Sequence, residues 1–99
     1  MFNFNNPYTN QNHQPDNDVF DFETLQKARQ DLIGEIQAVI EYDAHIHNTK
    51  DQTAIKTWES IKNEELIHIG ELLGLINYLD ENQRQYVLKG LAEFNDILG

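Results

Sequence analysis

From residue 21 to the end of the chain, apolar side chains recur at alternating steps of three and four residues. This spacing is typical of an α-helix that buries one face, whereas the strict alternation of a half-exposed β-strand is absent. The pattern is interrupted twice, by the polar segment HNTKDQ (47–52) and near Asp80. The chain is therefore predicted to be all-α, with helices over residues 21–48, 49–79 and 80–98.

Residues that favour the first position of a helix stand where each predicted helix begins. Asp21 is a good cap residue for the first helix. Thr49, followed three residues later by Gln52, predicts a capping box that starts the second. Asp80 with Gln83 repeats the pattern at the start of the third. The short break after the first helix predicts an antiparallel two-helix hairpin. The third helix is expected to be a packing element that covers the bundle or contacts neighbouring dimers.

Each of the two long helices carries one continuous seam of core-type positions. The first seam contains Leu25, Ala28, Leu32, Glu35, Val39, Tyr42 and Ile46. The second seam contains Ala54, Trp58, Ile61, Glu65, His68, Leu72, Leu75 and Leu79. All of these residues are apolar or aromatic except Glu35, Glu65 and His68, so these three polar side chains are predicted to point inward.

The hairpin also predicts which of these residues share a level. In an antiparallel pair, residues equidistant from a turn near Lys50 lie opposite one another, which places Glu35 opposite Glu65. His68 lies on the same helix face as Glu65, because residues three apart are neighbours on a helix. The remaining levels pair Leu25 with Leu75, Ala28 with Leu72, Leu32 with His68, Val39 with Ile61, Tyr42 with Trp58, and Ile46 with Ala54.

A layer of two facing carboxylates is unfavourable for stability unless something neutralises it. Neither seam contains a lysine or arginine, so a cation is the expected partner. Carboxylate and imidazole ligands together suit iron, manganese or zinc better than calcium. One hairpin offers half of the ligand set of a di-iron four-helix bundle. A two-fold homodimer would complete this set and would also cover the apolar seam.

Composition narrows the function classes further. The net charge of -10, with seven basic residues, argues against binding to nucleic acid. There is no cysteine, no signal peptide and no membrane-spanning apolar run, which indicates a cytoplasmic protein. Residues 1–18 are rich in Asn and Gln and carry both prolines, which predicts a flexible N-terminal tail. The helical domain is then expected to cover residues 19–99.

The stretches GEIQAVIEYDAHI (34–46) and IKNEELIHIGELL (61–73) resemble the encapsulated ferritin family, half-length ferritin-like proteins stored inside encapsulin shells. In that family a Glu, a Tyr seven residues on and a downstream Glu-x-x-His share the spacing of Glu35, Tyr42, Glu65 and His68. The resemblance covers roughly residues 25–95. It implies a ferritin-like four-helix bundle that forms when two chains dimerise.

The resemblance also implies an activity and partners. The activity is that of a ferroxidase, which oxidises Fe(II) to Fe(III) with dioxygen at a centre holding two irons between two chains, for iron storage or detoxification. Glu35 and Glu65 would be carboxylate ligands, His68 the nitrogen ligand and Tyr42 a nearby catalytic group. A ring of dimers, commonly a decamer, and an encapsulin shell protein are the implied partners, which would place the protein inside an encapsulin nanocompartment.

Two points stay open at the level of the sequence. Family members often carry further acids where this chain has Gly34 and Gln37, so their outer metal site is not expected in its usual form, and Asp31 or Glu41 are the candidates to replace it. The alternative function is a non-catalytic, metal-binding helical oligomerisation module that holds another divalent metal such as zinc.

Overall fold

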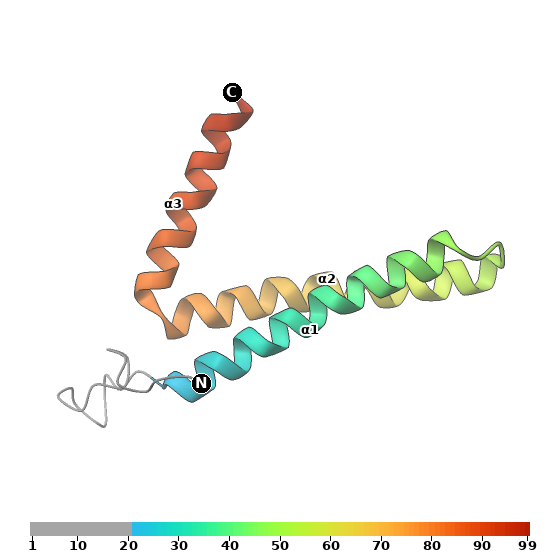
Figure 1. Cartoon of the computed structure of the whole chain (residues 1–99), viewed down its shortest axis with the longest axis horizontal. Helices are drawn as coiled ribbons and strands as arrows, with labels where there is room; N and C mark the ends of the chain where they lie inside the picture. The colour runs from blue at the N-terminus through green and yellow to red at the C-terminus, as the bar shows by residue number, and fades with distance from the viewer. Residues whose placement is uncertain (1–20) are drawn as a thin grey trace.

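The computed structural model describes residues 21–99, and this part of the chain consists of three α-helices with no strand (Figure 1). α1 (Phe22–His47) and α2 (Gln52–Leu79) lie side by side as an antiparallel hairpin, and α3 (Glu81–Leu98) projects away from one end of it. The all-α class and the hairpin with a shorter C-terminal helix are confirmed. The tail predicted over residues 1–18 lies outside the described residues.

The first and third helices begin as predicted. The Asp21 carboxylate accepts a hydrogen bond from the backbone N–H of Thr24 at 3.0 Å. The Asp80 carboxylate accepts one from the backbone N–H of Gln83 at 3.1 Å. Each bond satisfies one of the N–H groups that the first turn of a helix leaves without a partner.

The start of the second helix differs from the prediction. Asp51, not Thr49, caps α2, because its carboxylate accepts from the backbone N–H of Ala54 at 2.9 Å. The Thr49 hydroxyl instead accepts from the backbone N–H of Asp51 at 3.2 Å, within the turn. The predicted cap residue of α2 is therefore wrong by two positions. Thr and Asp both favour the cap position, and the Thr49–Gln52 spacing alone pointed to Thr49.

The best-packed part of the hairpin lies at the end from which α3 departs. Leu25, Ala28 and Ile76 are buried there, with Leu32 and Leu79 packed against them. The predicted level of Leu25 with Leu75 is wrong: Leu75 is 40% exposed, whereas Ile76 is 1% exposed. A straight helix drifts by roughly 20° per heptad relative to a strict 3.5-residue repeat, and this drift carries the buried face from position 75 to position 76.

Away from that end, the seam side chains are half-buried or exposed, because two helices alone cannot enclose a core. The third helix does not cover the hairpin as a packing element would, and nearly all of its residues are exposed. None of the helices within residues 21–99 combines the length and the apolar character needed to cross a bilayer.

Candidate metal site

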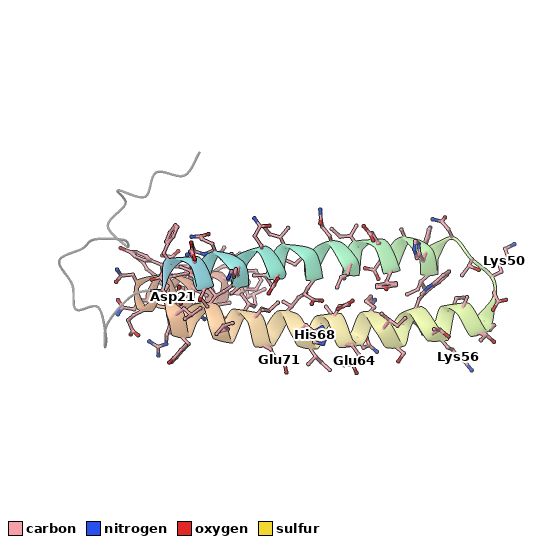
Figure 2. All side chains as sticks on the ribbon, turned by 90° about the horizontal axis from the view of Figure 1, so that it is seen from below. Asp21, Lys50, Lys56, Glu64, His68 and Glu71 are labelled. Carbon is pink, nitrogen blue, oxygen red and sulfur yellow. The ribbon has the colours of Figure 1, made fainter. Side chains whose placement is uncertain are left out.

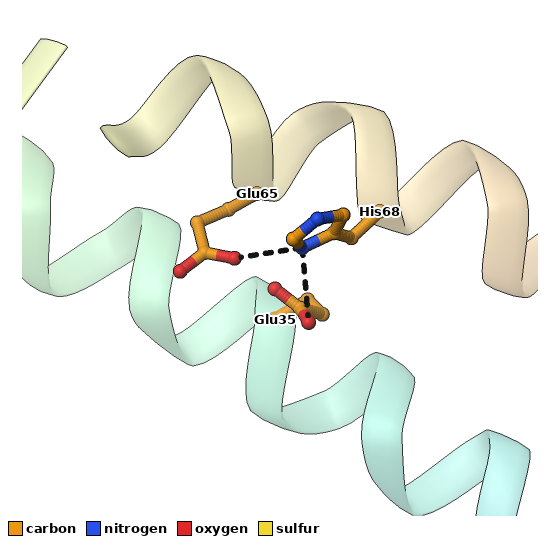
Figure 3. Close-up of side chains that lie close together, drawn as sticks. All are labelled: Glu35, Glu65 and His68. Atoms are coloured by element: carbon orange, nitrogen blue, oxygen red, sulfur yellow. Dashed lines mark hydrogen bonds and ion pairs between the residues drawn. The ribbon is translucent and has the colours of Figure 1, made fainter. Parts of the chain in front are cut away.

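The structure brings the three predicted ligands together near the middle of the hairpin (Figure 3). Glu35 comes from α1, while Glu65 and His68 come from successive turns of α2. The Nδ1 atom of His68 lies 3.2 Å from Oε1 of Glu65 and 3.4 Å from Oε2 of Glu35. One potential ligand atom from each of the three residues lies within 4.8 Å of the others, which is close enough for all three to contact one cation.

These side chains are less buried than their seam positions indicate. The exposed fractions of the side chains are 25% for Glu35, 19% for Glu65 and 44% for His68. They border an open hollow of about 600 Å³ on one face of the hairpin. Its lining consists of Gln30, Asp31, Gly34, Glu35, Ala38, Glu65, His68, Glu71, Leu72 and Leu75. The side-chain view of the hairpin places His68 between Glu64 and Glu71 along α2 (Figure 2).

No lysine or arginine balances the two glutamates. Within residues 21–99, the ion pairs of Glu35 and Glu65 are both made with His68. The arginine and lysine that bridge elements are engaged elsewhere, Arg29 with Asp80 and Lys62 with Asp43. The donor set of two carboxylates and one imidazole therefore has the composition that iron, manganese and zinc bind, and within residues 21–99 no lysine or arginine is paired with its carboxylates.

The crowding of these groups raises two pKa values. The hydrogen bond with Glu65 raises the pKa of Glu35 above its ordinary value of 4.5, and partial burial and the charge of Glu65 act in the same direction, against the opposing effect of His68. Partial burial lowers the pKa of His68, but hydrogen bonds and charge from Glu65 and Glu35 outweigh this, so it rises above 6.5. Without a cation, Glu35 and His68 therefore bind protons more tightly than the same groups do in water.

These raised pKa values predict that the stability of the metal-free protein falls with rising pH, whereas the stabilisation by a bound metal grows. Raised pKa values mean that the folded state binds protons more tightly than the unfolded state. The contribution of His68 to the stability of metal-free protein is therefore full below 6.5 and is lost as the pH rises through the higher, folded-state pKa. The contribution of Glu35 is likewise full below 4.5 and is lost as the pH rises through its raised pKa.

In chelator, the melting temperature is expected to fall between about pH 6 and about pH 8, whereas the increase that a divalent metal produces should grow over the same range. Thermal melts followed by circular dichroism measure both trends. A His68→Gln variant is the control, since it should lose much of the metal-free slope. Equal slopes for parent and variant would contradict the assignment of the proton to His68.

The fourth predicted site residue, Tyr42, is not part of the cluster of three ligands or of the lining of the hollow. Its ring lies edge-on to that of His45, with centroids 6.0 Å apart. His45 in turn packs against Trp58 at 4.9 Å. Tyr42 and Trp58, which were predicted to share a level, are thus linked through the ring of His45.

Which acidic residues border the hollow was not predicted from the sequence. Asp31 and Glu71 line it, whereas Glu41 does not. Asp31 lies one turn before Glu35, and Glu71 lies three residues after His68, so the signal available was helical spacing from the ligands themselves. Gly34 lies in the lining without a side chain, and a Cβ there would meet nothing within 4 Å, so the hollow is open at this point.

Comparison of the chain with models of protein families, with curated proteins and with solved structures gives no match. The three-helix fold and the Glu35, Glu65 and His68 cluster therefore define its class as an all-helical protein with a candidate metal site.

Proposed function

We propose that this protein is a ferroxidase that oxidises Fe(II) with dioxygen at a site shared by two chains. The observation that carries the proposal is the convergence of Glu35, Glu65 and His68, from two helices, on one solvent-accessible hollow. A structural role alone is a weaker explanation, because two adjacent carboxylates that share a single imidazole as their ion-pair partner repel each other across the helix pair.

The geometry of one chain supports a shared site. Three ligand atoms are too few to enclose a pair of metals, and the hollow beside them is open to solvent. In di-iron bundles, two helices each supply a Glu and two others each supply a Glu-x-x-His. A second copy related by a two-fold axis would supply the missing half, since Glu65-Leu66-Ile67-His68 and Glu35 recur in it.

Each residue then has a defined part in the reaction. Glu35 and Glu65 bind the iron through carboxylate oxygens, which favour the more highly charged ferric product. His68 would bind through the lone pair of an unprotonated ring nitrogen, so metal binding competes with the proton that its raised pKa favours. Fe(II) is the substrate, and bound iron supplies the electrons that dioxygen accepts. Asp31 and Glu71 place negative charge along the hollow that leads to these ligands.

The donor set equally suits zinc, so a metal-binding module without catalysis is the competing function. Metal content and oxygen consumption separate the two. Anaerobic protein given Fe(II) is expected to bind about two irons per pair of chains. On exposure to air it should consume oxygen and develop ferric absorbance faster than Fe(II) in buffer. Bound metal without iron-dependent oxygen uptake would instead assign the chain to the non-catalytic module.

A further inference from the structure

α3 extends from the hairpin as a separate arm and carries a stripe of apolar residues along one side (Figure 1). The members of the stripe recur at steps of four, three and four residues, which places them on one face of the helix. We call the α3 stripe these four residues: Val87, Leu91, Phe94 and Leu98. The exposed fractions of the last three are 58%, 52% and 71%. Within residues 21–99, the outer part of the α3 stripe is therefore largely uncovered.

The α3 stripe lies on the side of α3 that is turned towards α1. Gln83 precedes Val87 by four residues and therefore shares the face of the stripe. The Gln83 side chain accepts a hydrogen bond from the guanidinium of Arg29 on α1, which fixes the side of α3 that faces this helix. Arg29 also donates to Asp80, the single residue between α2 and α3, at 3.4 Å. The base of the stripe is therefore held next to the first turns of α1.

The chain that precedes α1 joins the fold beside the base of α3. Leu25 and Ile76 belong to one buried cluster. Asp21 precedes Leu25 by four residues, and in the antiparallel partner helix the equivalent step leads from Ile76 to Asp80. Asp21 and Asp80 therefore lie at about the same level, at the end of the hairpin from which α3 departs (Figure 2). Residues 1–20 are thus attached next to the first turn of α3.

Residues 1–20 have the length and the composition to cover the α3 stripe. α3 is 18 residues long, which corresponds to about 27 Å, and about eight residues of extended chain span that distance. Residues 1–20 contain two of the 17 acidic residues and no lysine or arginine, so they approach the stripe with less repulsion than a whole chain of net charge -10. Phe2, Phe4 and Tyr8 supply aromatic rings near the N-terminus.

The spacing of two of these rings matches the spacing of the stripe. Side chains two residues apart in an extended segment point to the same side and are about 7 Å apart, and Phe2 and Phe4 have this separation in sequence. Along an α-helix, a step of four residues rises about 6 Å. An extended segment that runs along α3 can therefore place both rings against successive residues of the stripe.

A buried acceptor near the base of α3 also lacks a donor. Oδ1 of Asn77, three residues before Asp80 on α2, is buried and accepts no hydrogen bond from any residue within 21–99. Leaving such an oxygen unpaired is costly, and most backbone N–H groups of the helices around it are already bonded within their own helices. A segment that packs over the base of α3 supplies free backbone N–H groups next to this oxygen.

We propose that residues 2–20 bind along the α3 stripe of the same chain, with Phe2 and Phe4 against its outer turns. Attachment beside the base of α3 favours this occupant, because a short tether gives an effective concentration on the order of mM at any protein concentration. A separate partner has to displace the tethered segment before it reaches the stripe. The contact requires neither a metal nor a second chain, so it is independent of the proposed ferroxidase activity.

Paramagnetic broadening of NMR signals in the full-length chain tests this contact. The chain contains no cysteine, so a nitroxide attached to Asn3→Cys labels one position, between the two rings. In chelator, the methyl signals of Leu91 and Leu98 should lose intensity, and those of Ile40, on α1 and far from Asp21, should not. A mixture of nitroxide-labelled chain and isotope-labelled chain without nitroxide should show no loss, because the contact forms within one chain.

Substitution of the two rings should remove the contact. Phe2→Ser combined with Phe4→Ser is expected to abolish the loss of intensity at Leu91. The matched control is Asn5→Ser combined with Asn6→Ser, which changes two polar residues of the same segment and should leave the loss as in the parent. All four positions lie outside the three helices, so circular dichroism should give the same helicity for both variants.

A substitution in the stripe tests the other side of the contact. Leu91→Glu should abolish the loss of intensity at Leu98. Ile97→Glu changes a side chain of 79% exposure on the same helix, outside the α3 stripe, and should retain the loss. If Leu91→Glu lowers the helicity, the paired substitution of Phe2 and Phe4 decides the test.

Three results would overturn the proposal. Unchanged signals of Leu91 and Leu98 in the labelled parent would mean that residues 2–20 do not cover the stripe. Loss of intensity in the mixed sample would show that the segment or the stripe binds a second copy instead. Loss that persists without Phe2 and Phe4 would mean that these rings do not hold the segment on α3. Because every sample is free of metal, none of these results bears on the oxidation of iron.

Discussion

Replacing Glu65 or His68 by alanine is expected to lower the initial rate of Fe(II) oxidation by at least about 100-fold, since groups that only support a metal ligand already cost 10- to 100-fold when lost. Each substitution removes one of the three donor atoms that lie within 4.8 Å of one another. In the proposed two-fold site every ligand occurs twice, so one substitution would remove two ligands from a pair of chains. Stopped-flow absorbance of the ferric product measures the effect.

Two matched controls use the same residue types outside the site. Glu64→Ala removes an exposed carboxylate next to Glu65 in sequence that does not line the hollow. His47→Ala removes an exposed imidazole near the end of α1. Both variants should oxidise iron at close to the parent rate. If Glu65→Ala and His68→Ala also retained that rate, the ferroxidase proposal would be wrong, whatever metal the site binds.

Ile76→Ala is expected to destabilise the folded chain by about 2–5 kcal/mol, the usual effect of truncating a fully buried aliphatic side chain. Ile76 is 1% exposed and packs in the small buried cluster with Leu25 and Ala28. Because the buried cluster contains only three residues, truncating Ile76 removes a large part of the apolar core. Urea unfolding in chelator, at one protein concentration, measures the change without contributions from metal binding or mass action.

Leu75→Ala is the paired control, since Leu75 occupies the neighbouring position that the seam spacing favoured but is 40% exposed. Its truncation should cost clearly less than that of Ile76. The reverse order would show that α2 is rotated relative to the structure. Such a rotation of one position would also move Glu65 and His68 relative to Glu35, so this comparison checks the site as well as the core.

The helical periodicity was sufficient to predict the hairpin and the meeting of Glu35 with Glu65 and His68. These predictions succeeded because a helix places residues three and four apart on one face regardless of details at its ends. The same argument was wrong at Leu75. The helical repeat of 3.6 residues departs slightly from the 3.5-residue spacing of the seam, and along a long helix this difference accumulates until the neighbouring residue is the buried one. It also placed the cluster deeper than it lies, because periodicity identifies a face and not what covers it.

The direction of α3 could not have been predicted in this way. It depends on a contact between Arg29 and Asp80, which are 51 residues apart in sequence, and on the extended backbone of Asp80, with φ of -132° and ψ of 95°. Neither feature leaves a periodic signal. The start of α2 was similarly ambiguous, because Thr49 and Asp51 both favour the cap and only the geometry of the turn selects Asp51.

The one-residue joint at Asp80 leaves the chain no slack between α2 and α3. An α-helix turns by about 100° per residue, so a single insertion within the first turn of α3 would swing its leucines and phenylalanine to a different side of the arm. Deletion would do the same in the opposite sense. The side to which α3 offers its apolar residues is therefore set by the length of this junction as much as by their identity, and length variation here should be far less tolerable than in the turn around Lys50.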